Sequence, residues 1–142
     1  MAVESVAMTL TELTGDVRML TITWSCATGA ATIVATDTNS KISAQLFGWW
    51  AFMAVIDPGA TAPTDNYDFI LNDSAGAKVF GTALDACDTA NSETFLPLLA
   101  GTAGADGHYG SRFISTALTF DITNNSNNAA NGIGYIYFSR RK

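Results

Sequence analysis

The sequence predicts an all-β fold: an antiparallel β-sandwich or jelly-roll-like sheet structure of seven to eight strands in a single domain. Apolar and polar residues alternate with a period of two along most of the chain, and turn signals recur about every eight to twelve residues. No segment has a convincing amphipathic helical pattern, and no repeat or linker divides the 142 residues. We expect an amino-terminal arm over residues 1–15 and the sandwich domain over residues 16–142.

The first strand of the domain is predicted over residues 17–26, VRMLTITWSC. Leu20, Ile22 and Trp24 fall on one face of this strand, and mainly hydroxyl side chains take the other, as in a half-buried strand. After the turn ATGA, residues 31–35 are predicted to be its hairpin partner. The arm before this strand has weak periodicity. It is expected to pair at a sheet edge or to reach onto a neighbouring subunit, with a frayed terminus as the alternative.

Residues 42–56, ISAQLFGWWAFMAVI, are the most apolar segment and are predicted to form a central strand. From Leu46 to Ile56 there is no alternation, and the adjacent Trp49 and Trp50 would point to opposite faces. A sandwich core covers only one face, so we expect the other to contact a second copy or a partner. Cover by a long loop, residues 81–110, is the alternative. The interface candidates are Phe47, Trp49, Trp50, Phe52 and Met53.

The remaining strands are predicted from the same alternation. Residues 67–71 are expected to form a hairpin with residues 77–80 across the turn NDSAG. Between residues 81 and 110 the pattern is blurred, with at most a short helical turn and a short strand. Regularity returns over residues 112–122, and residues 133–138 make the last strand after the Asn-rich turn TNNSNNAANG.

The stretch AVIDPGATAPTDNYDFIL contains an acidic, proline-containing loop. Its Asp57, Asp65, Asn66 and Asp68 carry oxygen ligands of the kind that Ca²⁺ prefers, but their spacing does not match an EF-hand. Because the prolines preset a bend and Asp and Asn are ordinary turn residues, the loop is interpreted as a bend between two strands. Contact with a partner or an ion is the alternative, and no metal site is predicted.

The charges limit the classes of partner. Charged residues make up 14% of the chain, against about 25% in ordinary soluble proteins. This indicates either a very compact molecule or a surface that partly meets other protein. The net charge of −6 argues against a nucleic-acid partner, because phosphate binding needs clustered Lys and Arg. The terminal cluster Arg140-Arg141-Lys142 is expected to be a solvated tail, with contact to an acidic neighbour as the alternative.

No membrane partner is expected, because the longest apolar run, residues 46–56, is far shorter than the roughly twenty residues that span a bilayer. The start MAVESVAMTLTEL also lacks the pattern of a signal peptide. We therefore expect a soluble protein made in a cytoplasm, with Cys26 and Cys87 as free thiols.

No constellation for catalysis is visible, so the protein is predicted not to be an enzyme and to need no cofactor. His108 is the single histidine and lies in the glycine-rich ADGHYG, where an exposed imidazole is expected. Cys87 lies between Asp85 and Asp88, whose charges would raise the pKa of its thiol, the wrong direction for a nucleophile. Two cysteines and one histidine also cannot complete a four-ligand zinc site.

Four stretches carry a resemblance to a known group: LTITWSCATGAAT, VIDPGATAPTDNYDFILND, DTANSETFLPLLAG and LTFDITNNSNNAANGIGYIYF. A Thr-rich first strand ends in Trp, an apolar strand enters Asp-Pro, and a TAPTDNYD loop precedes an acidic turn over residues 71–76. A late strand over residues 118–124 precedes the closing hairpin. From Met19 onward the chain thus resembles small virion structural proteins of tailed bacteriophages. It departs from them in FGWWAFMA, which is richer in aromatic residues and indicates a particular partner surface.

The resemblance implies a homo-oligomeric, all-β component of a phage particle, made in the host cytoplasm and carried on the virion. We expect a capsid decoration or cement protein that forms a trimer and binds the major capsid protein through apolar surfaces. A tail, neck or baseplate accessory protein is the alternative. From a different class, a carbohydrate-binding β-sandwich that uses exposed tryptophan and the Asp/Asn loop is a further alternative.

Overall fold

The computed structural model describes residues 4–100 and 107–141, which form eleven strands and one short helix. In chain order these are β1 (Ser5–Thr14), β2 (Val17–Ser25), β3 (Ile33–Asp37), α1 (Ser40–Leu46), β4 (Trp50–Pro58), β5 (Asp68–Asn72), β6 (Glu93–Phe95), β7 (Leu98–Ala100), β8 (His108–Tyr109), β9 (Arg112–Phe113), β10 (Thr119–Thr123) and β11 (Asn131–Ser139). The predicted all-β class is confirmed. Four strands, β6 to β9, have only two or three residues, and the seven longer ones are within the number predicted.

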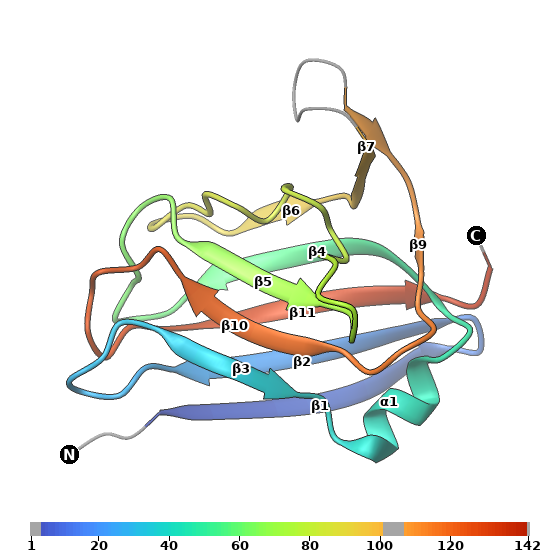
Figure 1. Cartoon of the computed structure of the whole chain (residues 1–142), viewed down its shortest axis with the longest axis horizontal. Helices are drawn as coiled ribbons and strands as arrows, with labels where there is room; N and C mark the ends of the chain where they lie inside the picture. Colours follow the sequence, from blue (N-terminus) through green and yellow to red (C-terminus); the bar gives the residue numbers. More distant parts are fainter. Residues whose placement is uncertain (1–3, 101–106, 142) are drawn as a thin grey trace.

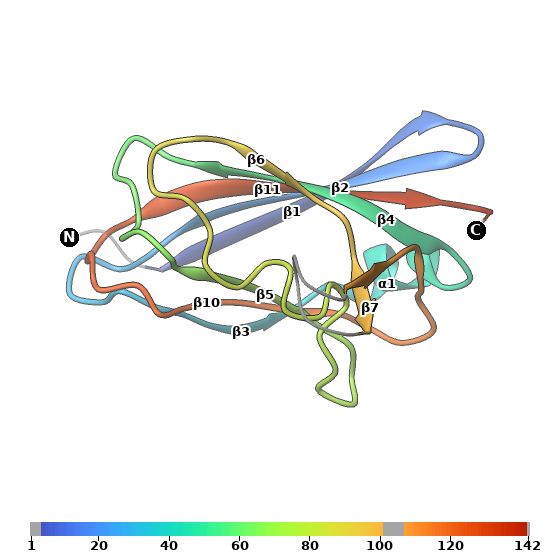
Figure 2. The ribbon, with the colours of Figure 1, turned by 90° about the horizontal axis from the view of Figure 1, so that it is seen from above.

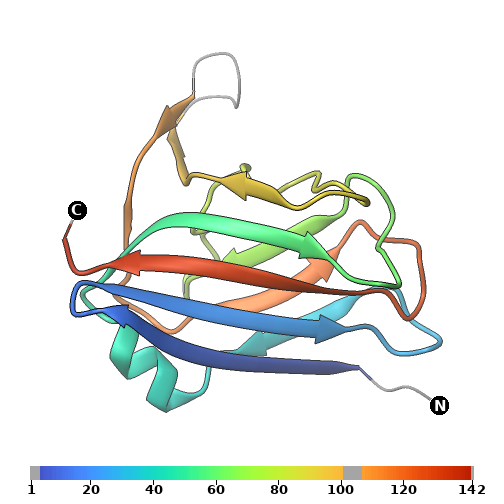
Figure 3. The same ribbon diagram turned by 180° about the vertical axis from the view of Figure 1, so that it is seen from behind.

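The longer strands form two layers (Figures 1 and 2). The large sheet has the order β1-β2-β11-β4-β6, with β9 also pairing β4, and the small sheet has the order β3-β10-β5. The pairs in both sheets are antiparallel. Helix α1 and the carboxyl end of the chain lie at one end of the sandwich, and the amino end lies at the other (Figures 1 and 3).

The core lies between the two sheets because every second side chain of each long strand points inward. From the large sheet, Leu20, Ile22 and Trp24 of β2 are buried, and from the small sheet Phe69 and Phe120 are buried. The rings of these two phenylalanines lie 4.8 Å apart between centroids. The strands predicted over residues 67–71 and 133–138 are thereby confirmed as β5 and β11, and the late strand over residues 118–124 as β10. The regular stretch predicted over residues 112–122 is not one strand, because it is interrupted between β9 and β10.

The prediction of one strand over residues 42–56 is wrong in its first part, which forms α1. The side chain of Asn39 caps this helix, with its Oδ1 accepting a hydrogen bond of 2.9 Å from the backbone N–H of Ile42. Ile42 and Leu46, four positions apart, are buried on one side of it. The chain then turns at Gly48, whose φ of 86° suits glycine, before β4 begins.

Within β4, Phe52 forms a β-bulge, because its neighbours Ala51 and Met53 pair with consecutive residues of β11. The extra residue switches the alternation of faces. Ala51 therefore shares the core face with Ala54 and Ile56, all at most 1% exposed, while Met53 points away from the core. A strand without a bulge would place Ala51 and Met53 on the same face, so the simple alternation expected of one strand over residues 42–56 is wrong here.

The predicted hairpin between β2 and residues 31–35 is also wrong. β2 already has β1 on one side and β11 on the other, so β3 instead pairs β10 in the small sheet. Residues 77–80 do not form the predicted strand, but Lys78 makes a single bridge to Asn72 and the Val79 N–H donates to the Leu71 carbonyl at 2.8 Å. This segment covers the free edge of β5.

The predicted amino-terminal arm supplies β1. It pairs β2 from Ser5 opposite Ser25 to Glu12 opposite Arg18, at the edge of the large sheet. The first of the alternatives for the arm, pairing at a sheet edge, is thus present in the chain itself. Residues 1–3 of the arm lie outside the described residues.

Candidate interaction surface

The large sheet has an apolar outer face, the side turned away from the small sheet. On β4 and β11, the half-buried residues of this side alternate with the buried core residues. The same alternation applies to β2. We define the outer face by the following residues: Val17, Met19, Thr21, Trp50, Phe52, Met53, Val55, Phe113, Ile133, Tyr135 and Tyr137.

Cross-strand rows make the outer face continuous. Tyr137 of β11 lies opposite Met19 on one neighbouring strand and Met53 on the other. The Phe52 ring packs on this row, with its centroid 6.2 Å from that of Tyr137. Tyr135 is at the centre of the next row. Since opposed residues of antiparallel strands have Cα atoms roughly 4.5–5.5 Å apart, the side chains of each row contact one another.

None of the outer-face residues is charged. The charges described near it lie at its rims: Asp57, opposite Ile133 at one end, and Arg141, which lines a shallow hollow with Val17 and Phe52 at the other. The two rims are therefore of opposite charge, and the centre offers only apolar, hydroxyl and phenol groups.

The small sheet has a different outer face. Its outward positions on β5 and β10 include the polar residues Asp68, Asn72 and Asp121, all of which are half-buried. Burial raises the pKa of the Asp121 carboxyl, and the Lys78 ammonium lowers it by a smaller amount. The two faces of this sandwich thus differ sharply in polarity.

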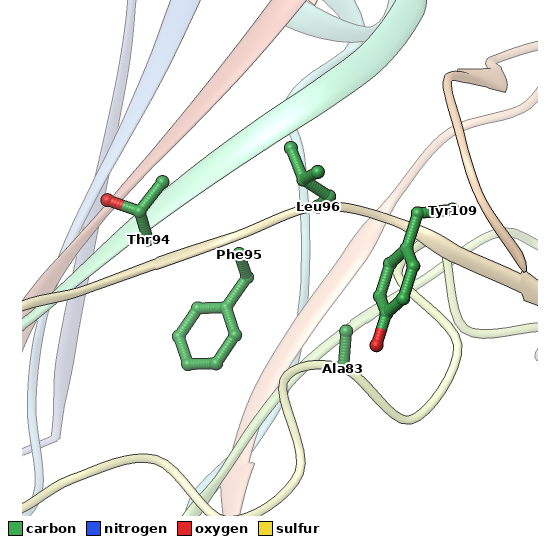
Figure 4. A pocket seen from close by; sticks show the side chains of 5 residues that line it. All are labelled: Ala83, Thr94, Phe95, Leu96 and Tyr109. Atoms are coloured by element: carbon green, nitrogen blue, oxygen red, sulfur yellow. The ribbon is translucent and has the colours of Figure 1, made fainter. Parts of the chain in front are cut away.

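Beside the outer face, an apolar groove of about 370 Å³ opens along β6 (Figure 4). Ala83, Thr94, Phe95, Leu96 and Tyr109 line it. Figure 4 shows the Phe95 and Tyr109 rings pointing toward the loop that carries Ala83, whereas Thr94 points to the opposite side of β6.

The β7–β8 hairpin stands away from both sheets (Figures 1 and 3). Leu98 pairs Tyr109 in this hairpin, and the apolar side chains around it are exposed. The exposed fractions are 51% for Leu96, 46% for Leu99 and 46% for Tyr109. Leu96 points to the same side as Thr94, which lies opposite Val55 of the outer face, whereas the Tyr109 ring points to the opposite side (Figure 4).

The interface candidates predicted from the sequence occupy different places. Trp50, Phe52 and Met53 lie together on the outer face. Phe47 ends α1 and is 46% exposed, away from them. Trp49 is only 7% exposed and packs in the core, with the Arg18 guanidinium 4.1 Å from its ring centroid. Trp49 therefore has little surface left for a partner, and we remove it from the set.

The Asp/Asn loop crosses from one sheet to the other. Asp57 is the next-to-last residue of β4 and accepts a hydrogen bond of 2.9 Å from the Ser92 hydroxyl, while Asp68 begins β5 and accepts one of 3.0 Å from the Ala86 N–H. Asn66 has a φ of 65° and its N–H donates to the Cys87 carbonyl.

Asp65 is exposed at the bend of this loop. Across residues 4–100 and 107–141, no group of three or more His, Cys, Asp or Glu side chains is arranged to hold a metal ion. The polar groups of the loop thus bind mainly the chain's own backbone.

Both cysteines are free, as predicted, and both are buried. Burial raises the pKa of the Cys87 thiol to about 12, with smaller increases from Glu93, Asp68 and Asp85. Burial also raises the pKa of Cys26. The predicted direction for Cys87 is confirmed, but its main cause is the loss of water and not the flanking charges.

The sequence interpretation missed the aromatic residues that β11 and β9 add to the outer face. Tyr135 and Tyr137 lie at its centre and Phe113 at its corner. A signal was available, because residues 133–138 are apolar on both alternating faces, the same feature that singled out β4. If this lack of alternation had been considered in both β4 and β11, the sequence would have predicted an apolar outer face two strands wide.

No protein-family model matches the chain, and neither does any curated protein or solved structure to which it was compared. In the described ranges, no helix combines the length and apolar character needed to cross a membrane.

Proposed function

We propose that this protein is a non-enzymatic structural component of a bacteriophage particle. It is made in the host cytoplasm and binds copies of itself and the major capsid protein through apolar surfaces, as a decoration or cement protein does. One observation carries the proposal: the centre of the outer face of the large sheet is apolar and uncharged, with the Asp57 carboxylate only at its rim, while the outer face of the small sheet carries carboxylates on both β5 and β10. Contiguous apolar patches of this kind mark interaction surfaces.

The composition of the outer face fits protein binding. Tyrosine, tryptophan, phenylalanine and methionine are enriched in interface cores, and aromatic anchors supply most of the binding energy. Trp50, Tyr135 and Tyr137 are the anchors that we propose. A stable interface buries about 1,600 Å² in total. The outer face spans three neighbouring strands, β2, β11 and β4, and we propose that it forms the centre of an interface of this size.

Carbohydrate binding is less well supported, because the tryptophans are not displayed as platforms. Trp24 and Trp49 are buried, and Trp50 packs edge-on against Phe113. A tail, neck or baseplate location uses the same surface and differs only in where the copies lie.

Immunogold electron microscopy tests the proposal, using an antibody against this chain and phage particles from a lysate in which it is expressed. Gold over the whole shell supports a decoration role, and gold at one vertex or on the tail replaces it by the accessory role. Unlabelled particles, with all of the chain in the soluble fraction, would contradict the proposal.

A pair of lysine variants tests the surface. Met53→Lys places an ammonium in the centre of the outer face and should reduce the copies per particle at least tenfold, since a desolvated charge without a partner costs well over 1.4 kcal/mol. Val34→Lys is the matched control: Val34 is 69% exposed on β3 of the small sheet, and its replacement should leave the copy number unchanged. Equal incorporation of both variants into particles would contradict the assignment of the outer face as the binding surface.

A further inference from the structure

β1 is a ten-residue strand whose outer edge has no partner strand in the described part of the chain. The other edges are short or covered. β4 is flanked by β6 and β9, and the free edge of β5 makes backbone hydrogen bonds to other segments, such as that which the Phe69 N–H donates to the Leu84 carbonyl at 3.1 Å. β3 has only five residues. The longest strand of the molecule is thus also the most open one.

This edge lacks the features by which sheet proteins prevent pairing with another strand. Such features are lysine, proline, a bulge or a very short strand. From Ser5 to Thr11 there is neither a charged residue nor a proline, and the register with β2 runs without a bulge from Ser5 to Glu12. The edge is therefore regular, uncharged and ready to accept a further strand.

The inner side of β1 also lacks full cover. Val6, Met8 and Leu10 pack against the core but remain partly exposed, whereas the corresponding residues of β2 are fully buried. A strand added at this edge with apolar residues on the same side would bury their flanks. β1 of a second copy has such an alternation, because Val6, Met8 and Leu10 all lie on one side of the strand.

We propose that β1 pairs with β1 of a second copy, antiparallel across a two-fold axis, with Thr9 opposite Thr9. A two-fold axis perpendicular to the sheet keeps both inner sides on one face, so Met8 lies opposite Leu10 of the second copy. The outward Ala7 then lies opposite Thr11. The product is one continuous sheet across two sandwiches.

Charge selects this arrangement among the close alternatives. A parallel pairing in register would place Glu4 beside Glu4 and Glu12 beside Glu12. An antiparallel pairing centred on Met8 would place Glu4 opposite Glu12, and like charges directly opposite are destabilising. Centring on Thr9 pairs Val6–Glu12 of the two copies, all within the regular part of the strand, and places no carboxylate directly opposite another.

This pairing does not depend on the virion role, and it predicts a dimer where the phage resemblance alone leads to a trimer. It leaves the outer face free and joins two copies of it into a surface twice as wide. Loss of the dimer and loss of particle binding are therefore separable results.

Cysteine cross-linking tests the pairing. Residues directly opposite in an antiparallel ladder have Cα atoms about 4.5–5.5 Å apart, within the range that a disulfide bridges. Oxidised Thr9→Cys should run as a covalent dimer on a denaturing gel, and mixed Ala7→Cys and Thr11→Cys should cross-link to each other. Thr23→Cys, exposed on the interior strand β2, is the matched control and should stay monomeric. The native cysteines are buried and add no background.

Light scattering after size exclusion completes the test. The wild type should have twice the chain mass of 15.0 kDa, and Thr9→Lys should have the single mass because two ammonium groups would face each other on the axis. Thr23→Lys should stay dimeric. A wild type of one or three chain masses, or a dimer in which Thr9→Cys does not cross-link, would overturn the inference.

Discussion

Trp50 of β4 and Phe113 of β9 lie opposite each other in register, and their rings meet edge to face with centroids 5.0 Å apart. The contact leaves Phe113 48% exposed and Trp50 half-buried. It joins the outer face of the large sheet to the segment that leads from the protruding β7–β8 hairpin. The apolar surface therefore continues around the end of β4.

Phe113→Ala should shift the tryptophan emission to longer wavelength, because Trp50 gains contact with water while Trp24 and Trp49 stay in the core. The stability loss should be modest, about 1 kcal/mol for the lost aromatic pair. Fluorescence and a urea titration measure both. Leu99→Ala, at an exposed position of β7, is the control and should leave the emission unchanged. A shift of equal size in this control would contradict the contact between Phe113 and Trp50.

Gly134→Ala should destabilise the protein by about 1–3 kcal/mol through overpacking. A Cβ at this position of β11 would lie 2.4 Å from an atom of the Phe69 ring, so the two sheets could not keep their spacing. Gly15→Ala is the matched control, since nothing lies within 4 Å of its added Cβ. Urea unfolding compares the two, and an equal stability of both variants would show that β5 does not pack on β11 as described.

The two thiols should be inert in the native protein. Burial raises the pKa of Cys87 to about 12 and also raises that of Cys26, so neither supplies thiolate near neutral pH. Ellman's reagent should react with neither cysteine in buffer and with both in concentrated urea. Rapid reaction of one thiol in the folded protein would place that cysteine at the surface.

Asp121→Asn should raise the melting temperature at neutral pH. Burial raises the pKa of Asp121, so the native state binds the proton more tightly than the unfolded chain, and ionisation above the ordinary value of 3.8 costs native stability. The cost is relieved as the pH falls through the raised pKa. Thermal melts should therefore show a gain that shrinks toward about pH 4.

Asp65→Asn provides the comparison for this measurement, since Asp65 is exposed. This substitution should change the melting temperature little, because an exposed side chain makes few contacts in the folded protein. If Asp121→Asn lowered the melting temperature at neutral pH, the charge would be stabilising and the Lys78 ammonium would outweigh the burial.

Most of the sheet structure could be predicted because alternation is a direct consequence of burying one side of a strand. Leu20, Ile22 and Trp24 identified β2, and Phe120 with Ile122 identified β10. The partner of β3 was not predictable in this way. Periodicity shows that a strand has a buried side, but it does not show in which of two sheets that strand lies.

The middle segment shows where periodicity fails. Helix α1 has only seven residues, and its buried apolar pair, Ile42 and Leu46, merges with the apolar run that follows. The bulge at Phe52 leaves no trace in composition, yet it reverses the faces of every later residue of β4. Trp49 was assigned to an interface for a different reason. The turn at Gly48, which directs Trp49 into the core, was not recognised.

The central claim is that the outer face of the large sheet is the surface that other proteins cover. Hydroxyl-radical footprinting tests it most directly, comparing free protein with intact particles and using Met19, Met53, Tyr135 and Tyr137 as probes. We predict that oxidation of these four side chains falls several-fold in the particle, while exposed Val34 on the small sheet is labelled equally in free and assembled protein. Undiminished oxidation of the four, with protection of the small sheet instead, would contradict it.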